Sequence, residues 1–343
     1  MGAKRHEARG CHQHSRPMHI LTHGLLSFVL LLALAWGLAA LWIQAPGGAG
    51  LRLVWMTLWA ASVLACLASL WTAHRYAVPA RWLLAVAAAI LASWWNSLAP
   101  SNQRDWADDV ARNLSGRVQG SVVTLHNIRN FDWRSRTDYT ARWQDGRYDL
   151  DALQSVDMVL SYWMGPAIAH TLVSFGFADG RHLAFSVEIR KERDESFSVV
   201  GGFFKQFERS IVAAEERDIL YVRAGPRGER VFLYPVRMPR PAMRELFLAY
   251  VDSANRLARA PRFYNTVTAN CTTLVYDMVR PIVPGLPMDV RLILSGYLPE
   301  YLYRHGGLDT SQPLEVLRAR ADITERAAQA GPATDFSQRI RQP

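Results

Sequence analysis

Three long apolar segments open the chain, and each approaches the length of a membrane-spanning helix. Residues 20–43, 53–71 and 82–99 contain no Lys, Arg, Asp or Glu. An α-helix needs about 20 apolar residues to cross a bilayer. The first segment is also longer than the roughly 7–15 apolar residues of a secretory signal peptide. We therefore predict three retained transmembrane helices.

The basic residues around these segments predict the orientation of the protein in a bacterial inner membrane. Four of them precede the first segment, namely Lys4, Arg5, Arg9 and Arg16. Arg75 and Arg81 lie between the second and third segments, whereas the loop at 44–52 carries only Arg52. Because cytoplasmic loops are enriched in Lys and Arg, we expect a cytoplasmic tail at 1–19 and a periplasmic domain after residue 100.

The same distribution explains most of the formal net charge of +9. Seven basic residues and one acidic residue precede residue 100, and the remainder is nearly balanced. No basic run with interleaved aromatic residues follows, so we predict no nucleic-acid partner.

Beyond the apolar segments, the pattern predicts an α+β domain at 121–310. Residues 100–120 are polar and indicate a short connecting helix or linker. Period-two runs predict strands at 121–125, 156–160, 197–204, 219–223 and 230–236, the last two joined as a hairpin over 225–228. Helical periodicity predicts helices at about 241–258 and 271–279. The charged tail at 311–343 is expected to be a helix followed by disorder.

Residues 169–190 predict a β-hairpin with a defined register. The turn Ala178-Asp179-Gly180 contains a glycine that can supply the positive φ of a three-residue loop. A turn centred on Asp179 places Val173 opposite Phe185 and His170 opposite Glu188. A shift by one residue would mix the apolar and polar faces, so the pattern selects this register.

Cys271 is the residue that most strongly indicates chemistry, because it is the only cysteine after residue 100. The other two, Cys11 and Cys66, lie in the tail and in the second apolar segment. A thiol at the start of a helix is favoured as a thiolate. His170 is the candidate base, and Glu188 would lie with its Cβ about 5 Å from that of the histidine, close enough to orient it.

Other polar residues near this thiol are candidates for supporting roles. Asn270 is a candidate N-cap, and its amide with nearby backbone N–H groups could hold an oxyanion. Thr272 and Asn265 are further candidates for oxyanion binding or site support. Three polar residues of an upstream segment, Arg129, Asn130 and Asp132, could line the cleft or tie a loop together.

A structural interpretation of the same residues stays open. Cys271 shares a helix face with Leu274, Val275 and Met278, as a small core residue would. The histidines, including a His-rich stretch at 6–19, show no standard ligand spacing, so we expect no metal and no cofactor.

Four segments occur together in one order: 126–134, 169–177, 186–192 and 264–273. As a set over about 120–305, they resemble the bacterial Lnb N-terminal periplasmic domain family. The resemblance implies a Cys–His pair that moves an acyl chain to a lipoprotein, with His170 and Cys271 at the matching positions. The order of His before Cys is also similar to circularly permuted papain-like folds of the NlpC/P60 kind, and implies such a fold.

We therefore expect a membrane-anchored thiol acyltransferase or hydrolase that forms a thioester, with a lipid or lipoprotein substrate. Three spans precede the domain here, whereas spans follow it in the protein that gives the family its name, so the substrate stays open. The alternatives are a peptidoglycan amidase or endopeptidase of the NlpC/P60 type and a non-catalytic module that binds the cell envelope. The sequence does not define the oligomeric state.

Overall fold

The computed structural model describes residues 15–72 and 76–342, which form two compact units divided between Ala99 and Pro100. Most of the basic and His-rich tail, including Cys11, and also Arg75 lie outside the described residues.

The first unit consists of three helices, α1 (Ser15–Gln44), α2 (Ala49–Trp71) and α3 (Ala77–Ser97). All three are long and apolar enough to cross a membrane, as the sequence predicts. The second and third begin four or five residues earlier than expected, so Arg52 and Arg81 lie inside helices and not in loops. The helices pack through small and apolar side chains such as Val63, Trp59 and Leu91.

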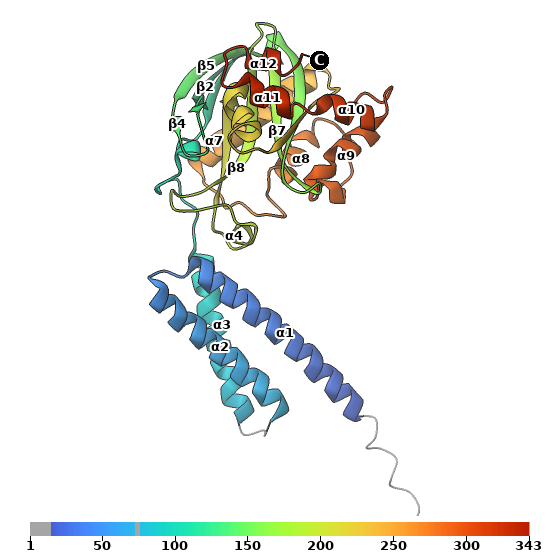
Figure 1. Ribbon diagram of the computed structural model, residues 1–343. Coiled ribbons are helices and arrows are strands. Elements are labelled where there is room, and N and C mark those ends of the chain that lie inside the picture. The colour runs from blue at the N-terminus through green and yellow to red at the C-terminus, as the bar shows by residue number, and fades with distance from the viewer. Residues whose placement is uncertain (1–14, 73–75, 343) are drawn as a thin grey trace, which may run out of the picture. The chain divides into compact units, whose positions relative to one another are not determined.

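The second unit is built on an eight-stranded sheet with the order β1-β2-β9-β8-β7-β6-β10, in which β5 pairs with β2 (Figure 1). Its strands are β1 (Ser115–Gln119), β2 (Val122–Arg129), β5 (Trp143–Asp149), β6 (Leu153–Met164), β7 (Ile168–Phe177), β8 (His182–Arg190), β9 (Glu208–Glu215) and β10 (Arg230–Pro235). A small hairpin of β3 (Asp132–Trp133) and β4 (Tyr139–Thr140) lies apart from it.

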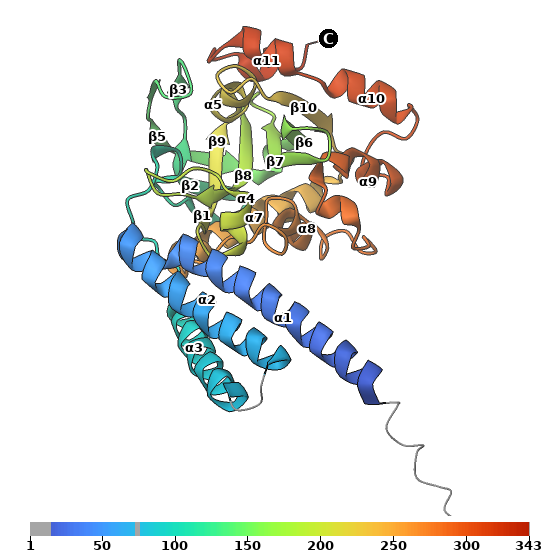
Figure 2. The same cartoon turned by 60° about the horizontal axis from the view of Figure 1, so that its bottom comes forward.

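Helices cover both faces of this sheet (Figure 2). One face carries α7 (Arg240–Arg259) and α8 (Thr273–Val279), and the other carries α5 (Glu216–Ile219), α6 (Tyr221–Ala224), α11 (Thr324–Ala330) and α12 (Phe336–Arg339). Beside β6 and β10 lie α9 (Leu298–Arg304) and α10 (Leu314–Ala321). The unit is therefore a mixed α+β domain, as expected.

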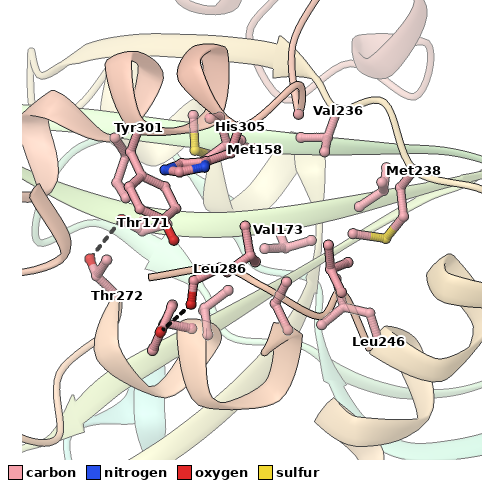
Figure 3. Close-up of a pocket in the computed structure, with 18 of the residues that line it drawn as sticks. Met158, Thr171, Val173, Val236, Met238, Leu246, Thr272, Leu286, Tyr301 and His305 are labelled. Carbon is pink, nitrogen blue, oxygen red and sulfur yellow. Dashed lines mark hydrogen bonds between the residues drawn. The ribbon is translucent and has the colours of Figure 1, made fainter. Parts of the chain in front are cut away.

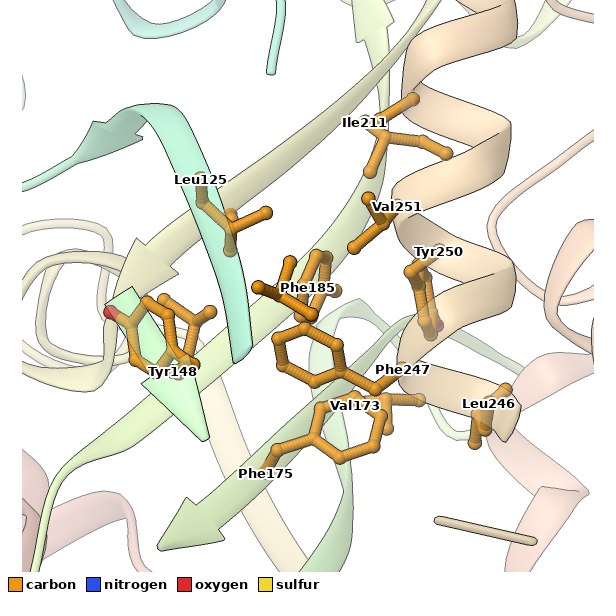
Figure 4. Close-up of a cluster of buried hydrophobic side chains, with 14 of the residues drawn as sticks. Leu125, Tyr148, Val173, Phe175, Phe185, Ile211, Leu246, Phe247, Tyr250 and Val251 are labelled. Atoms are coloured by element: carbon orange, nitrogen blue, oxygen red, sulfur yellow. The ribbon is translucent and has the colours of Figure 1, made fainter. Parts of the chain in front are cut away.

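The larger core lies between the sheet and α7 (Figure 4). Phe185 of β8 stacks on Tyr250 of α7 with ring centroids 4.8 Å apart, and Phe247 packs edge-on against Phe185 at 5.1 Å. The buried face of α7 contains the residues that its helical periodicity predicts.

The β7–β8 hairpin has the predicted register. Val173 pairs with Phe185 and Leu172 with Ser186, and Gly180 has φ +83° in the turn. This register aims alternate residues of both strands at the same face, which is how His170 and Glu188 come to face one another.

Three predictions of strands and loops are wrong. The segment at 197–204 is not a strand but contains the short helix α4 (Val199–Phe203), whose N-terminus is capped by Ser198. The segment at 219–223 lies in α5 and α6, so no hairpin forms over 225–228, and β10 pairs with β6 instead. The apolar residues of these segments pack against neighbouring elements, and this packing outweighs their β-propensity.

The two polar ends of the second unit are also more ordered than predicted. Residues 100–120 are not a connecting helix, because they include β1 and a 3-10 turn at Asp108–Val110. The segment after residue 310 is not disordered: α10, α11 and α12 pack on the sheet and bury Phe336 and Ile340.

Candidate active site

Cys271 is held just before α8, at a tight turn stabilised by Asn270. The helix begins at Thr273, two residues later than predicted. The Oδ1 atom of Asn270 accepts the backbone N–H groups of Thr272 and Thr273, both at 2.9 Å, so Asn270 caps the first turn as expected. The side chain of Cys271 is 8% exposed and is free of any disulfide.

The groups predicted to hold an oxyanion are mostly engaged elsewhere. The Asn270 Nδ2 atom donates to the Thr266 carbonyl at 2.8 Å, and its Oδ1 occupies the two N–H groups of the turn. Asn265 accepts the N–H groups of Val267 and Thr268 and so stabilises the preceding loop.

The hydroxyl oxygen of Tyr264, a residue that the sequence did not single out, accepts a hydrogen bond from the backbone N–H of Cys271. Burial, with the nearby thiolate second, raises the pKa of Tyr264, so this hydroxyl keeps its proton and remains a donor. The hydrogen bonds to the Cys271 sulfur itself come from His170, from the Thr171 backbone and from the Thr272 hydroxyl.

His170 on β7 faces Cys271 through one ring nitrogen and a carboxylate through the other. Its Nε2 atom lies 2.6 Å from the Ser186 hydroxyl and 3.2 Å from Glu188 Oε1. Ser186 in turn donates to Glu188 at 2.7 Å. Because Ser186 gives its proton to the carboxylate, it accepts from Nε2–H, which leaves Nδ1 for the thiol. The predicted pairing of His170 with Glu188 therefore includes Ser186, a residue that the sequence did not single out.

Arg223 of α6 also binds Glu188, at the oxygen that contacts His170 and Ser186. The guanidinium donates to Glu188 Oε1 at 2.9 Å and lies 3.4 Å from Glu229, which also accepts from Ser161. Arg223 is almost fully buried. The segment that carries it was predicted as a strand, so this contact could not be foreseen.

The electrostatics of the three groups favour an ion pair between Cys271 and His170. Burial alone would lower the pKa of His170, but the Glu188 carboxylate and the Cys271 thiolate together outweigh it and raise that pKa to about 9. Burial would raise the pKa of Cys271, yet the charge and hydrogen bond of His170 lower it below its ordinary value. The pKa of Glu188 is held well below its ordinary value, against burial, by His170 and Arg223. Opposite charges at close range in a low dielectric have this effect.

The thiol opens into a pocket of about 390 Å³, here called the thiol pocket. His170, Glu188, Tyr264 and Thr272 line it, together with apolar side chains from the end of β6 and from the α4 segment. The pocket thus combines reactive groups with an apolar wall, as small-molecule sites commonly do.

A second pocket of about 170 Å³ adjoins the first and is lined almost wholly by aliphatic and aromatic side chains (Figure 3). Thr272 lines both pockets, and its hydroxyl is hydrogen-bonded at 3.1 Å to that of Thr171, which lines the second pocket. The Thr272 hydroxyl lies 3.9 Å from the Cys271 sulfur. This apolar pocket therefore begins beside the thiol, with the two threonines between.

The candidates at 129–132 tie loops together and do not line the thiol pocket. Arg129 forms a buried bidentate pair with Asp218 at 2.9 and 3.1 Å. Asn130 donates to Gln144 at 2.9 Å, and Asp132 accepts from Arg217 at 2.7 Å.

No group of three or more His, Cys, Asp or Glu residues is placed to hold a metal ion in the described part of the chain.

Comparison with known protein families gives one match, which covers residues 139–296 and is described as the Lnb N-terminal periplasmic domain. This confirms the resemblance seen in the sequence motifs. No curated protein and no solved structure matches the chain. With three candidate membrane helices, the match fits a membrane protein that has a periplasmic domain.

Proposed function

We propose, from the premise that residues 139–296 form an Lnb N-terminal periplasmic domain, that this protein is a thiol acyltransferase or hydrolase. The observation that carries the proposal is the connected chain from Cys271 through His170 and Ser186 to Glu188. A nucleophile, a base and a group that orients the base are the parts that covalent acyl transfer requires.

The reaction would begin with attack of the Cys271 thiolate on an ester or amide carbonyl. The C=O π bond opens as the S–C bond forms, and the oxyanion accepts a hydrogen bond from the Tyr264 hydroxyl, whose oxygen accepts from the Cys271 N–H. Collapse of the tetrahedral intermediate forms a thioester, and imidazolium His170 gives its proton to the departing alcohol or amine.

The thioester would then be resolved by an amine or by water. Neutral His170 takes a proton from the incoming nucleophile, which attacks the thioester carbonyl. The S–C bond breaks, the acyl group leaves on the acceptor, and the thiolate–imidazolium pair is restored. Arg223 supports both steps indirectly, because it fixes the carboxylate that holds the imidazole.

The apolar pocket beside the thiol favours a substrate with a hydrophobic acyl chain, such as a lipid-linked or lipoprotein substrate. A chain attached to Cys271 could pass Thr272 and remove its methylene groups from water, at about 0.8 kcal/mol for each. A muropeptide, the substrate of the amidase alternative, would not gain from these side chains.

Family and charge distribution together support the topology assigned to this enzyme. The N-terminus would be cytoplasmic and the globular domain periplasmic, as the positive-inside rule predicts for three spans.

The experiment is acyl-enzyme trapping on the full chain in lipid nanodiscs. After incubation with a phospholipid donor, mass spectrometry should find an acyl adduct on Cys271 and none in Cys271→Ser. Cys66→Ser is the matched control, because Cys66 is the other buried thiol described, and it should keep the adduct. An adduct with muropeptides only would support the amidase alternative. Absence of any adduct, with Cys271→Ser merely destabilised, would support a non-catalytic module.

A further inference from the structure

The large apolar side chains exposed on the second unit are concentrated in one place. Among its described residues ten such side chains are exposed, and nine of them lie in three short segments, 163–164, 197–203 and 288–293. The tenth is Val118 on β1. We call the nine side chains the apolar rim. Scattered exposed hydrophobic residues need no explanation, but a contiguous group does.

The apolar rim borders the thiol pocket. Each of its three segments contributes to that pocket, through residues such as Trp163, Phe197 and Ile293. The rings of Trp163 and Phe197 lie edge to face, 6.1 Å apart, so two of the segments are in direct contact.

Helix α4 presents its apolar residues outward and its glycines inward. A Cβ on Gly201 would meet Gln206 Oε1 at 1.8 Å, and one on Gly202 would meet Thr266 Oγ1 at 2.2 Å, so the two glycines are the residues that face the domain closely. Val200 and Phe203 are consequently turned to the outside and are 54% and 45% exposed. A soluble domain normally places the apolar side of a helix inward.

The chain enters the second unit beside the segment that carries α4. Ser101 donates its N–H to Glu208 at 2.9 Å, and Trp106 pairs with Glu192. The segment between Glu192 and Glu208 is the one that contains α4. The last candidate span ends at Ser97, only four residues before Ser101, so a bilayer is available to this end of the domain.

We propose that the apolar rim inserts into the membrane interface, so that the thiol pocket opens onto lipid and not onto water. Burial of the rim side chains in the interface would remove them from water, which is the ordinary driving force for such attachment. This inference does not require Cys271 to be a nucleophile, because it rests on exposure, position and chain connectivity alone.

The test is collision accessibility of a nitroxide label on the full chain in lipid nanodiscs, with Cys11, Cys66 and Cys271 replaced by serine. One variant carries Val200→Cys for the label and the matched control carries Val118→Cys, since both valines are exposed to a similar extent. At position 200 we expect collisions with oxygen, which dissolves in lipid, to exceed those with a water-soluble nickel complex severalfold. At position 118 we expect the reverse.

Two results would overturn the proposal. Equal preference for the nickel complex at both positions would show that the rim faces water. Protection of position 200 from both reagents would show that a protein, such as a second copy, covers it. As a check that keeps native cysteines, lipid-borne diazirine should label the peptide that contains α4 in the wild-type chain and leave the peptide that contains β1 unlabelled; labelling of both or of neither counts against insertion.

Discussion

Two of the clusters of buried charge in the second unit differ in the group at which their contacts end. Around Asp218, the carboxylate accepts from Arg129, from the Phe131 N–H and from the Trp133 indole, and the cluster is closed. Around Glu188, the chain of contacts ends at His170 and a thiol in an open pocket.

The difference shows that one buried charge cluster stabilises the fold, whereas the other can also support a reaction. Every contact of the Asp218 carboxylate is a strong hydrogen bond within one loop, so the cluster fixes that loop and leaves nothing to react. The charge of Glu188 instead stabilises an imidazolium, which can exchange its proton with Cys271. Burial of charge is common to both clusters, and only the second couples it to a nucleophile and a cavity.

The largest effect should come from breaking the closed cluster. Asp218→Ala leaves Arg129 buried without its partner, and we expect a loss of about 3–5 kcal/mol in the free energy of unfolding. Denaturant titration measures it. Asp132→Ala, on a more exposed pair, should cost no more than about 1 kcal/mol. Alkylation of Cys271 should stay unchanged in the folded fraction of Asp218→Ala, and a slowed reaction would show that the clusters are not independent.

Breaking the open cluster should instead change reactivity. Glu188→Gln removes the charge that stabilises imidazolium His170, so the pKa of His170 should fall by about 1–3 units. The rate of Cys271 alkylation at pH 6 should fall with it. Glu192→Gln, near the end of the same strand but outside the thiol pocket, is the control and should alkylate like the wild type. Identical pH profiles for both variants would remove Glu188 from the site.

A smaller effect is expected for Ser186→Ala. The serine relays a hydrogen bond between His170 and Glu188, but the direct approach of 3.2 Å between them survives its loss. The pH profile of alkylation should shift in the same direction as in Glu188→Gln and by less. A larger shift than that of Glu188→Gln would mean that the carboxylate acts only through the hydroxyl.

The smallest effect concerns stability against pH. His170, with its pKa raised from 6.5 to about 9, contributes stability that is complete below pH 6.5 and is lost as pH rises to 9. Cys271, with its pKa lowered from 9.0, contributes in the opposite sense, because its contribution grows as pH approaches 9. The two oppose each other in the wild type.

Between pH 6.5 and 9 the stability of the wild type should therefore depend little on the protonation of this pair, which thermal melts measure. Cys271→Ser should lower the pKa of His170, because the thiolate is one of the groups that raise it to about 9. NMR titration of the His170 ring measures that pKa, and the same value in both proteins would indicate that no ion pair forms.

Local pattern was enough to predict some of this site, and long-range packing decided the rest. Strict alternation and the glycine turn gave the register of β7 and β8, and with it the approach of His170 to Glu188. The apolar stripe of α7 was equally plain. Asn270 was recognisable as a cap because its side chain acts within its own turn.

The residues that escaped prediction are those whose role depends on distant partners. The central strand β9 has charged residues at both ends, and its Glu208 is buried only because Ser101 and Arg104 meet it. Arg223 contacts Glu188 from α6, a segment whose sequence pattern predicts a strand. Ser186 differs in no local feature from Ser174 on the neighbouring strand, which pairs with Ala184.

The central claim is that Cys271 and His170 form a poised thiolate–imidazolium pair. The most direct measurement is the pH dependence of Cys271 alkylation by a small neutral electrophile, with Cys11 and Cys66 replaced, in an otherwise wild-type chain and in His170→Ala. We predict fast alkylation at pH 6 that falls at least about tenfold when His170 is removed, because the thiolate then loses its counter-charge. Equal rates in the two proteins, or an ordinary thiol profile in both, would contradict the account.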